Sequence, residues 1–463
     1  MRTGQTPDTQ AWQASRRGVL RLGAAAAVAG PLALSTPAQA AGLSSPRLLA
    51  RAEDFLRRMT DAYPAADGSG PRLAQSYSDE NGLFSTAFVY DNAFAVCAAL
   101  TGRDVALART LGDGLLHAQD NDPGYDDGRL RQAYNVGPYT FYDGVPSPYD
   151  FVLPDGGANV GYQFGFLGTA VGDMAWPGMA LVQLAEHTGD PRYLAGALRI
   201  AGWIVSNTRS EVGLGGFSFG VTGGNQPVPN KSTEHNIDCV GFFSQLAAAT
   251  GDQDWLEQAA HARAFVERVW EPVEGFFFTG SNDGVTINPD PLPLDPQTWS
   301  WLALQDEEYA RALDWAGREL AATDDASQPT SQLPDGIQVS GVTFSSASLR
   351  STAQYNGTQV HPQGVWLEGT AQLACALADR RRGGDRRAAR QLLDQVAVAQ
   401  REVGQGQRVG GQVLPAASGV VAASSLLDSG FGFGYFQSQH VGATAWYVMA
   451  GRDANPMVTG GLR

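Results

Sequence analysis

Cysteine, basic charge and long apolar runs are all scarce in this chain of 463 residues, and each scarcity excludes a class of protein. The three cysteines, Cys97, Cys239 and Cys375, form no CxxC pair and lie inside apolar helical patterns, so we expect buried free thiols. There are 32 basic residues against 47 acidic ones, and a net charge of −15 disfavours nucleic acid and anionic membranes as partners. We find no apolar run long enough to span a membrane.

Familiar catalytic motifs are also missing. The sequence has no nucleotide-binding glycine motif, no GxSxG nucleophile elbow and no HExxH metal motif. The acidic stretch from Asp120 to Gly128 lacks the spacing and terminal glutamate of an EF-hand, so it predicts a solvated turn. The sequence therefore predicts neither a metal site nor a cofactor.

The composition, 43% hydrophobic and 17% charged, is typical of a folded globular protein. At the N-terminus, Arg16-Arg17 precedes a short apolar stretch and the small-residue site Ala38-Gln39-Ala40. This arrangement resembles a twin-arginine export signal. We therefore expect residues 1–40 to be a signal peptide, and residues 41–463 to be a single domain that works outside the cytoplasm.

One pattern recurs six times after residue 41. A polar signature leads into an apolar helix. In the first five cases a short turn then joins this helix to an amphipathic one, and a further helix, Leu48 to Met59, precedes the first case. The apolar helices begin near Asp91, Asp173, Glu234, Asp295, Glu368 and His440. Successive starts are 82, 61, 61, 73 and 72 residues apart, about the length that a helical hairpin with its loops requires.

The two kinds of helix predict the architecture. A helix that is apolar nearly all round must be surrounded by protein, whereas a helix with one apolar stripe can face water. Six of each predict an all-α fold, an (α/α)6 toroid with an inner and an outer ring. Links such as Thr188-Gly189-Asp190 close one end, because Gly ends one helix and Asp caps the next. The inner helices then all begin at the other end, where long loops form a mouth; the loop of residues 323–363 includes a strand-like piece, Ile337 to Phe344.

Carboxylates and tryptophans should converge on this mouth. Asp173 and Asp295 occupy positions typical of helix N-caps, whereas Glu234 and Glu368 are not favoured cap types. Flat aromatic rings stack on sugar faces, and paired carboxylates can hydrolyse glycosidic bonds. The tryptophans in the first turns are Trp176, Trp299, Trp366 and Trp446.

The hairpin count and the helix-start motifs resemble the six-hairpin glycosidase superfamily. The motifs are Tyr90-Asp91-Asn92-Ala93, Ser232 to Asp238, Leu294 to Trp299 and Trp366 to Ala371. The resemblance implies an (α/α)6 toroid that acts on poly- or oligosaccharides.

Within this resemblance we assign Glu368 as the general acid and Glu234 as the base, with Asp91 as the next candidate for either role. Residues expected to bind sugar or orient water are His235, Asn236, Asp238, Asp295, Trp299, Trp366, His440, Tyr134 and Arg131. We expect a monomer with a carbohydrate substrate.

Other interpretations remain open. A polysaccharide lyase on the same toroid could use His235, Asn236, Tyr134 and Arg131, although an acidic mouth is poorly suited to a polyanion. A toroidal sugar epimerase would rely on His235 and His440. A toroidal zinc cyclase fits less well, because the cysteines lie in mid-helix. A non-catalytic glycan-binding protein would keep the aromatic residues without needing two glutamates.

Overall fold

The computed structural model describes residues 46–63, 70–161 and 165–462, so the expected signal peptide lies outside the described residues. From Ser44 to Arg463 the chain forms one compact unit. The α-helices of the described part are α1 (Pro46–Thr60), α2 (Val89–Thr101), α3 (Val105–Asp120), α4 (Val171–Thr188), α5 (Pro191–Thr208), α6 (Thr233–Thr250), α7 (Asp254–Arg268), α8 (Asp295–Leu304), α9 (Arg311–Glu319), α10 (Leu367–Arg380), α11 (Asp385–Glu402) and α12 (Val441–Gly451).

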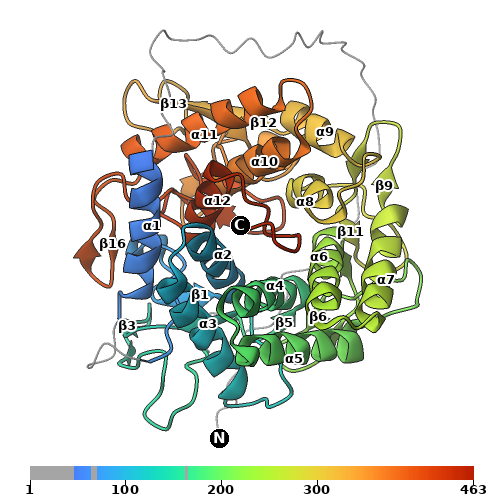
Figure 1. Ribbon diagram of the computed structural model, residues 1–463. Helices are drawn as coiled ribbons and strands as arrows, with labels where there is room; N and C mark the ends of the chain where they lie inside the picture. The colour runs from blue at the N-terminus through green and yellow to red at the C-terminus, as the bar shows by residue number, and fades with distance from the viewer. Residues whose placement is uncertain (1–45, 64–69, 162–164, 463) are drawn as a thin grey trace, which may run out of the picture. The chain divides into compact units, whose positions relative to one another are not determined.

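These helices form two concentric rings (Figure 1). The even-numbered helices α2 to α12 form the inner ring; each packs against the next, and α12 packs against α2. The outer ring consists of α3, α5, α7, α9, α11 and α1, and α1 closes the circle by packing against α12. The predicted all-α, (α/α)6 toroid is confirmed.

The burial of the two helix types follows the predicted pattern. Every residue of α2 from Asp91 to Leu100 is buried, whereas α11 buries a stripe that includes Ala389, Leu393 and Val396. The link after α4 also behaves as expected: Gly189 has a left-handed φ of 68°, and the Asp190 side chain accepts a hydrogen bond from a backbone N–H of α5.

Short strands connect the hairpins. They are β1 (Thr86–Phe88), β2 (Ala133–Asn135), β3 (Tyr139–Thr140), β4 (Pro146–Ser147), β5 (Thr169–Ala170), β6 (Gly220–Val221), β7 (Pro227–Val228), β8 (Lys231–Ser232), β9 (Trp270–Glu271), β10 (Phe276–Phe277), β11 (Gly280–Ser281), β12 (Ala321–Asp325), β13 (Gln338–Val342), β14 (Gln354–Tyr355), β15 (Thr358–Gln359), β16 (Arg408–Val409), β17 (Gln412–Val413), β18 (Leu427–Asp428) and β19 (Gly434–Tyr435). All the described pairings are antiparallel, and β13 confirms the strand-like piece predicted between Ile337 and Phe344.

A polar clamp fastens several inner helices to the loops beside them. The Asn92 side chain accepts a hydrogen bond from the Ala74 N–H and donates one to the Ala74 carbonyl. Asn236 of α6 and Gln297 of α8 make the same reciprocal pair with Phe217 and Phe277. These amides satisfy loop backbone groups that would otherwise be buried without partners. The recurrent polar signature therefore has a structural part as well as a carboxylate part.

The end of the chain fills the centre of the toroid (Figure 1). The Pro456 carbonyl accepts hydrogen bonds of 2.7 and 3.1 Å from Gln183 and Gln245, and Asn455 donates to the Leu302 carbonyl. We call Ala454–Met457 the C-terminal plug; all four of its residues are buried. The plug contacts the middle and later turns of the inner helices, and thus leaves their first turns free for the mouth.

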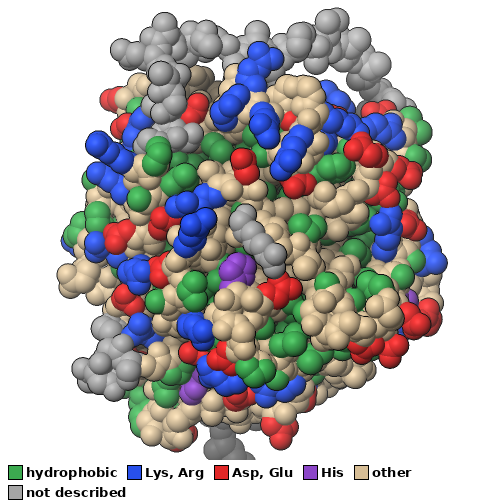
Figure 2. Space-filling model, in the orientation of Figure 1, with side chains coloured by type: hydrophobic (Ala, Val, Ile, Leu, Met, Phe, Trp, Pro, Cys, Tyr) green, Lys and Arg blue, Asp and Glu red, His purple; other side chains and the backbone are tan. Residues whose placement is uncertain are grey.

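The three cysteines are buried free thiols, as predicted. On the face shown in Figure 2, basic and acidic side chains are interspersed. Within the described ranges, no helix combines the length and the apolar character needed to cross a bilayer.

Candidate active site

Six carboxyl groups lie in the first two turns of five inner helices. Helices α2, α4, α8 and α10 contribute one each, and α6 contributes two that are four residues apart. We call these groups the carboxylate ring: Asp91, Asp173, Glu234, Asp238, Asp295 and Glu368. The sixth inner helix, α12, contributes His440 as its N-cap.

Contacts between the inner helices bring members of the carboxylate ring close together in two places. Atoms of Asp91, Glu368 and His440, from α2, α10 and the start of α12, lie within 4.8 Å of one another. On the other side, a Cβ on Gly172 of α4 would lie 2.5 Å from the His235 ring of α6. Only glycine therefore permits the close approach of α4 and α6 at this point.

Neither aspartate that resembled an N-cap in the sequence is one. The N-cap of α4 is Ala170, and Asp173 lies inside the helix. The N-cap of α8 is Leu294, so Asp295 is the first helical residue. Asp295 Oδ1 is buried and has no hydrogen-bond partner among the described residues. Neither carboxyl group caps its helix; the Asp173 side chain hydrogen-bonds to Gln132, and the Asp295 side chain to Gln372.

The environment favours the protonated form of most ring members. Burial raises the pKa of Asp173 and of Asp295 to about 7. Burial, and then repulsion from neighbouring carboxylates, raises the pKa of three further groups well above the usual range: Glu234, Asp238 and Glu368. A ring that keeps protons near neutral pH can donate them.

The burial of these carboxyl groups should cost stability at high pH. A carboxyl group whose pKa is raised by folding stabilises the fold below its unfolded pKa, near 4, and this stabilisation is lost as the pH rises through its folded pKa, near 7 for Asp295. We expect Asp295→Asn to increase the free energy of unfolding at pH 8 by on the order of 1–4 kcal/mol, with a smaller difference near pH 4. Urea unfolding at both pH values measures the effect. The exposed Asp126→Asn is the control, and an Asp295→Asn protein less stable than wild type at pH 8 would refute the expectation.

The members of the carboxylate ring are not equally accessible to solvent. Glu234 and Asp173 are partly exposed, whereas the other four side chains belong to residues that are 0–4% exposed. Of the two predicted catalytic glutamates, Glu234 is thus the one that faces the opening, and Glu368 lies deeper.

Asp91, His440 and Glu368 form a continuous array. His440 Nε2 lies 3.0 Å from Asp91 Oδ1, and His440 Nδ1 lies 3.5 Å from Glu368 Oε2. His440 is 0% exposed, so it cannot contact a substrate directly, contrary to the sequence-based expectation.

The donor set of this array resembles a metal site, but its geometry does not fit one. A cation at Nε2 would face only Asp91, and a cation at Nδ1 would compete with the Ala443 N–H that this nitrogen accepts. Because the imidazole separates the two carboxyl groups, we interpret the array as a hydrogen-bonded chain.

Tryptophans form the floor of the mouth, one turn further into the toroid. The rings of Trp176 and Trp299 lie 5.1 Å apart, Phe94 meets Trp176 edge to face at 4.6 Å, and Trp446 stacks on Trp299. Trp299 is 3% exposed. It packs the floor and does not offer a face to sugar, which corrects the predicted binding role.

Aromatic side chains from loops form a wall above the ring. Trp366 is covered by Phe344 and Tyr435, at 4.7 and 5.5 Å, so it supports the wall and does not itself bind sugar as predicted. Phe433 leans on both covering residues and remains 46% exposed. A half-exposed ring on a buried aromatic base is suited to stacking on a sugar face.

On the opposite side of Glu368, Tyr77 stacks on His440 with ring centroids 4.2 Å apart, and Tyr90 hydrogen-bonds to Tyr77. Sequence reasoning did not single out Tyr77, Tyr435 or Phe433, because they come from loops distant in sequence. Only Tyr90 carried a signal, its position next to Asp91.

Three predicted binding residues have structural roles instead. All three guanidinium nitrogens of Arg131 are engaged, by Asp122 and the Leu167 carbonyl. Tyr134 is 1% exposed and accepts a hydrogen bond from the Arg131 N–H. Asn236 is the polar clamp of α6. These groups hold loops around the mouth and are not available to a substrate.

His235 does reach the carboxylate ring, and it does so as a neutral imidazole. Burial lowers its pKa to about 4, and its ring packs 4.7 Å from Phe219. Asp238 is 0% exposed and lies beside it, as the approach of both side chains to Gly172 shows.

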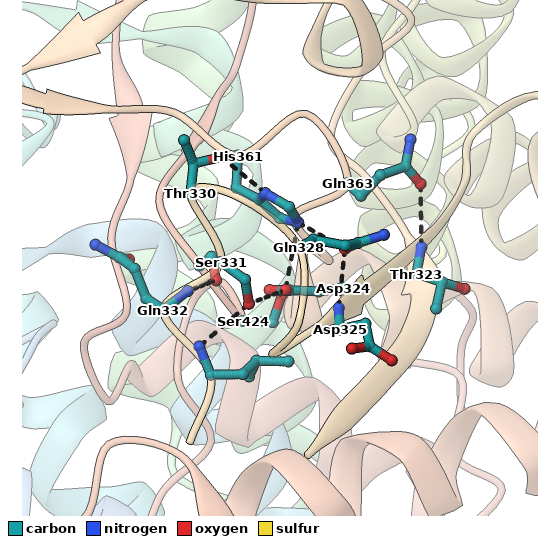
Figure 3. A network of polar contacts seen from close by, with 12 residues as sticks. Thr323, Asp324, Asp325, Gln328, Thr330, Ser331, Gln332, His361, Gln363 and Ser424 are labelled. Carbon is teal, nitrogen blue, oxygen red and sulfur yellow. Dashed lines mark hydrogen bonds and ion pairs between the residues drawn. The ribbon is translucent and has the colours of Figure 1, made fainter. Parts of the chain in front are cut away.

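A second buried acid–histidine pair lies among the loops (Figure 3). Asp324 of β12 accepts hydrogen bonds of 2.6 Å from both Ser331 and Ser424 and lies 3.3 Å from His361. His361 also contacts Thr330. The Thr330 hydroxyl lies 3.0 Å from His361 Nδ1, whereas no serine hydroxyl bonds to the histidine within this network, which joins three loops.

This network predicts an effect on stability without an effect on chemistry. Asp324→Asn cannot accept both serine hydroxyls and would leave buried polar groups unsatisfied, so the free energy of unfolding should fall by about 1–3 kcal/mol. Denaturant unfolding measures the loss, with the exposed Asp335→Asn as the control. A stability equal to wild type would contradict this role.

Comparisons with known proteins agree at the level of fold. No protein-family model and no curated protein sequence matches the chain. A cellobiose 2-epimerase from Bacillus thermoamylovorans has a TM-score of 0.55 at 11% identity, covering 88% of this chain and 99% of that one. A family 76 mannosidase from Bacteroides thetaiotaomicron has a TM-score of 0.53 at 11% identity, covering 88% and 97%. A glycosidase in complex with glucose has a TM-score of 0.50 at 14% identity, covering 90% and 100%. The TM-scores show a shared six-hairpin, glycosidase-like toroid, and identities this low show nothing finer.

Proposed function

We propose that this protein is a secreted glycoside hydrolase that cleaves a poly- or oligosaccharide with a pair of ring carboxyl groups. The observation that carries the proposal is the carboxylate ring itself. Five helices bring six carboxyl groups together beneath an aromatic wall, and burial favours the protonated forms of five of them, Asp173, Glu234, Asp238, Asp295 and Glu368.

Glu368 is the proposed general acid and Glu234 the proposed base. Glu368 donates its proton to the glycosidic oxygen as the bond from that oxygen to the anomeric carbon breaks. Glu234, the more accessible residue, must first lose its own proton, and in its ionised form it takes a proton from water as the water oxygen bonds to the anomeric carbon. The ionised ring members then stabilise the positive charge that develops on the sugar. The products are two sugars with free hydroxyl groups, and atoms balance.

The alternatives fit the site less well. A lyase needs a group that neutralises the uronate carboxylate, but Arg131 is fully engaged by Asp122 and Leu167, and the ring would repel a polyanion. An epimerase is favoured by one structural neighbour, but of the two histidines considered for it, His440 is 0% exposed and His235 only 9% exposed. A glycan-binding protein has no use for crowded, proton-holding carboxyl groups that cost stability.

The test is product analysis of protein beginning at Ala41 on a broad panel of polysaccharides. Hydrolysis yields new reducing ends without ultraviolet absorbance. Absorbance from unsaturated uronates would support the lyase, an isomerised sugar of unchanged length would support the epimerase, and binding without turnover would support the glycan-binding protein.

A further inference from the structure

The first turn of α12 is built around two carboxyl groups that belong to other helices. Gly442 lies in this turn, where alanine would be favoured by helix propensity. A Cβ at Gly442 would lie 2.6 Å from Asp91 Oδ1 and 2.8 Å from Glu368 Oε2, so both carboxyl oxygens rest against the bare Cα. The glycine is therefore explained by the space that these oxygens occupy.

The hydrogen bond by which His440 caps α12 determines which nitrogen of its imidazole carries the proton. The Ala443 N–H donates to His440 Nδ1 at 3.3 Å, so Nδ1 presents a lone pair. The proton of a neutral imidazole must then be on Nε2, which lies 3.0–3.2 Å from both oxygens of Asp91. Histidine is an unusual cap residue, and this one also bridges two acids.

The two faces of the imidazole treat the two acids differently. The Nε2–H donates a stronger hydrogen bond to an ionised Asp91 than to a protonated one. The Nδ1 lone pair, which accepts from the Ala443 N–H, also lies 3.5 Å from Glu368 Oε2, where it would repel the lone pairs of an ionised Glu368 and so favours the protonated form. Tyr77, stacked on the imidazole, holds the ring plane in place.

We propose that His440 is a positioning residue that assigns the proton to Glu368 and the negative charge to Asp91, with Gly442 providing the contact that keeps the three groups together. This inference deepens the proposed function, because it explains why Glu368 and not Asp91 is the acid. In the resting site Glu368 keeps its proton. When a glycosidic oxygen arrives, that proton passes to the leaving group, and Asp91 stays ionised throughout.

Titratable groups from several elements surround Glu368. The titratable groups that act on Glu368 are Tyr90 and Asp91 from α2, Glu234 from α6, Asp295 from α8, Tyr77 from the segment before β1, Tyr435 from β19, and His440. Variants at His440 and Gly442 replace none of the carboxyl groups, and so isolate the contribution of the array.

The test uses His440→Asn and Gly442→Ala. Asparagine is a favoured N-cap, so His440→Asn keeps the cap but cannot bridge two acids. Gly442→Ala changes no ionisable group but must push Asp91 and Glu368 apart. The matched controls are His187→Asn at the far end of α4, and Gly202→Ala in α5, where an added Cβ meets nothing within 4 Å.

Infrared difference spectroscopy gives a readout that needs no substrate. The protonated-carboxyl band that disappears in Glu368→Gln belongs to Glu368. We expect its titration midpoint to fall by about one pH unit or more in both variants, and not to move in the controls. An unchanged midpoint in His440→Asn and Gly442→Ala, in proteins that remain folded by circular dichroism, overturns the inference.

Kinetics on the substrate found by the panel give the second readout. A general acid must be protonated, so the basic limb of the kcat/KM profile should move to lower pH in both variants, with kcat reduced about 10- to 100-fold and KM little changed. If Glu368→Gln abolishes hydrolysis while both variants keep the wild-type pH profile, the hydrolase stands and the array has no role in it. If the midpoint shifts but no polysaccharide is hydrolysed, the array stands and the proposed function falls.

Discussion

Replacing Glu368 by Gln should reduce kcat on the natural substrate by about 10²- to 10⁴-fold and leave KM nearly unchanged. The amide cannot protonate a leaving oxygen, but it keeps the size of the side chain and can still pair with Gln372, which lies 3.3 Å from Glu368 Oε1. The loss therefore falls on the transition state and not on binding.

The leaving group separates the acid role from other roles. An aryl glycoside with an acidic phenol needs little protonation, so Glu368→Gln should be much less impaired on it than on the natural substrate. Glu234→Gln should be impaired on both and partly rescued by azide, which replaces the water that Glu234 activates. The exposed Glu257→Gln on α7 is the control. Equal losses on both substrates in Glu368→Gln would contradict its assignment as the acid.

Truncating Met457 to Ala should lower the free energy of unfolding by about 2–5 kcal/mol. Met457 is 1% exposed and contacts Gly241 of α6 within the toroid, so the truncation leaves a cavity that the surrounding helices cannot easily fill. The C-terminal plug also satisfies Gln183 and Gln245, and a shift of its backbone would weaken those hydrogen bonds.

The control for this prediction is Met457→Leu, which conserves volume and should cost less than about 1.5 kcal/mol. Denaturant unfolding measures both variants. Because the plug lies away from the first turns of the inner helices, the folded Met457→Ala protein should keep its kcat. A stability equal to that of wild type would show that the plug is not part of the core, and a loss of kcat without a loss of stability would show that it reaches the chemistry.

The alternation of apolar and amphipathic helices was sufficient to predict the toroid. The positions of apolar residues along a helix determine whether it is buried on all sides or along one stripe. The same alternation placed Asp91, Glu234 and Glu368 at the starts of inner helices, where the structure has them. It could not reveal that Ala454–Met457 closes the centre, because the contacts of this segment join it to helices distant in sequence.

The finer errors have local physical causes. Arg131 and Tyr134 looked like a mouth-lining pair, but Asp122 lies near enough to engage the guanidinium and bury it. Asp295 precedes a proline and resembled a cap, but the helix begins one residue earlier than that pattern suggests. His440 was expected to bind sugar, and its burial between Asp91 and Glu368 depends on Gly442, whose importance appears only once three helices are in place.

The measurement that tests the central claim most directly is hydrolysis in water enriched in heavy oxygen, with the products analysed by mass spectrometry. If Glu234 and Glu368 cleave a glycosidic bond by activating water, one heavy oxygen atom should appear at the anomeric carbon of the new reducing end. Both Gln variants should form this labelled product far more slowly than wild type and the Glu257→Gln control. Products without the label, or labelled products formed at the wild-type rate by both variants, would contradict the account.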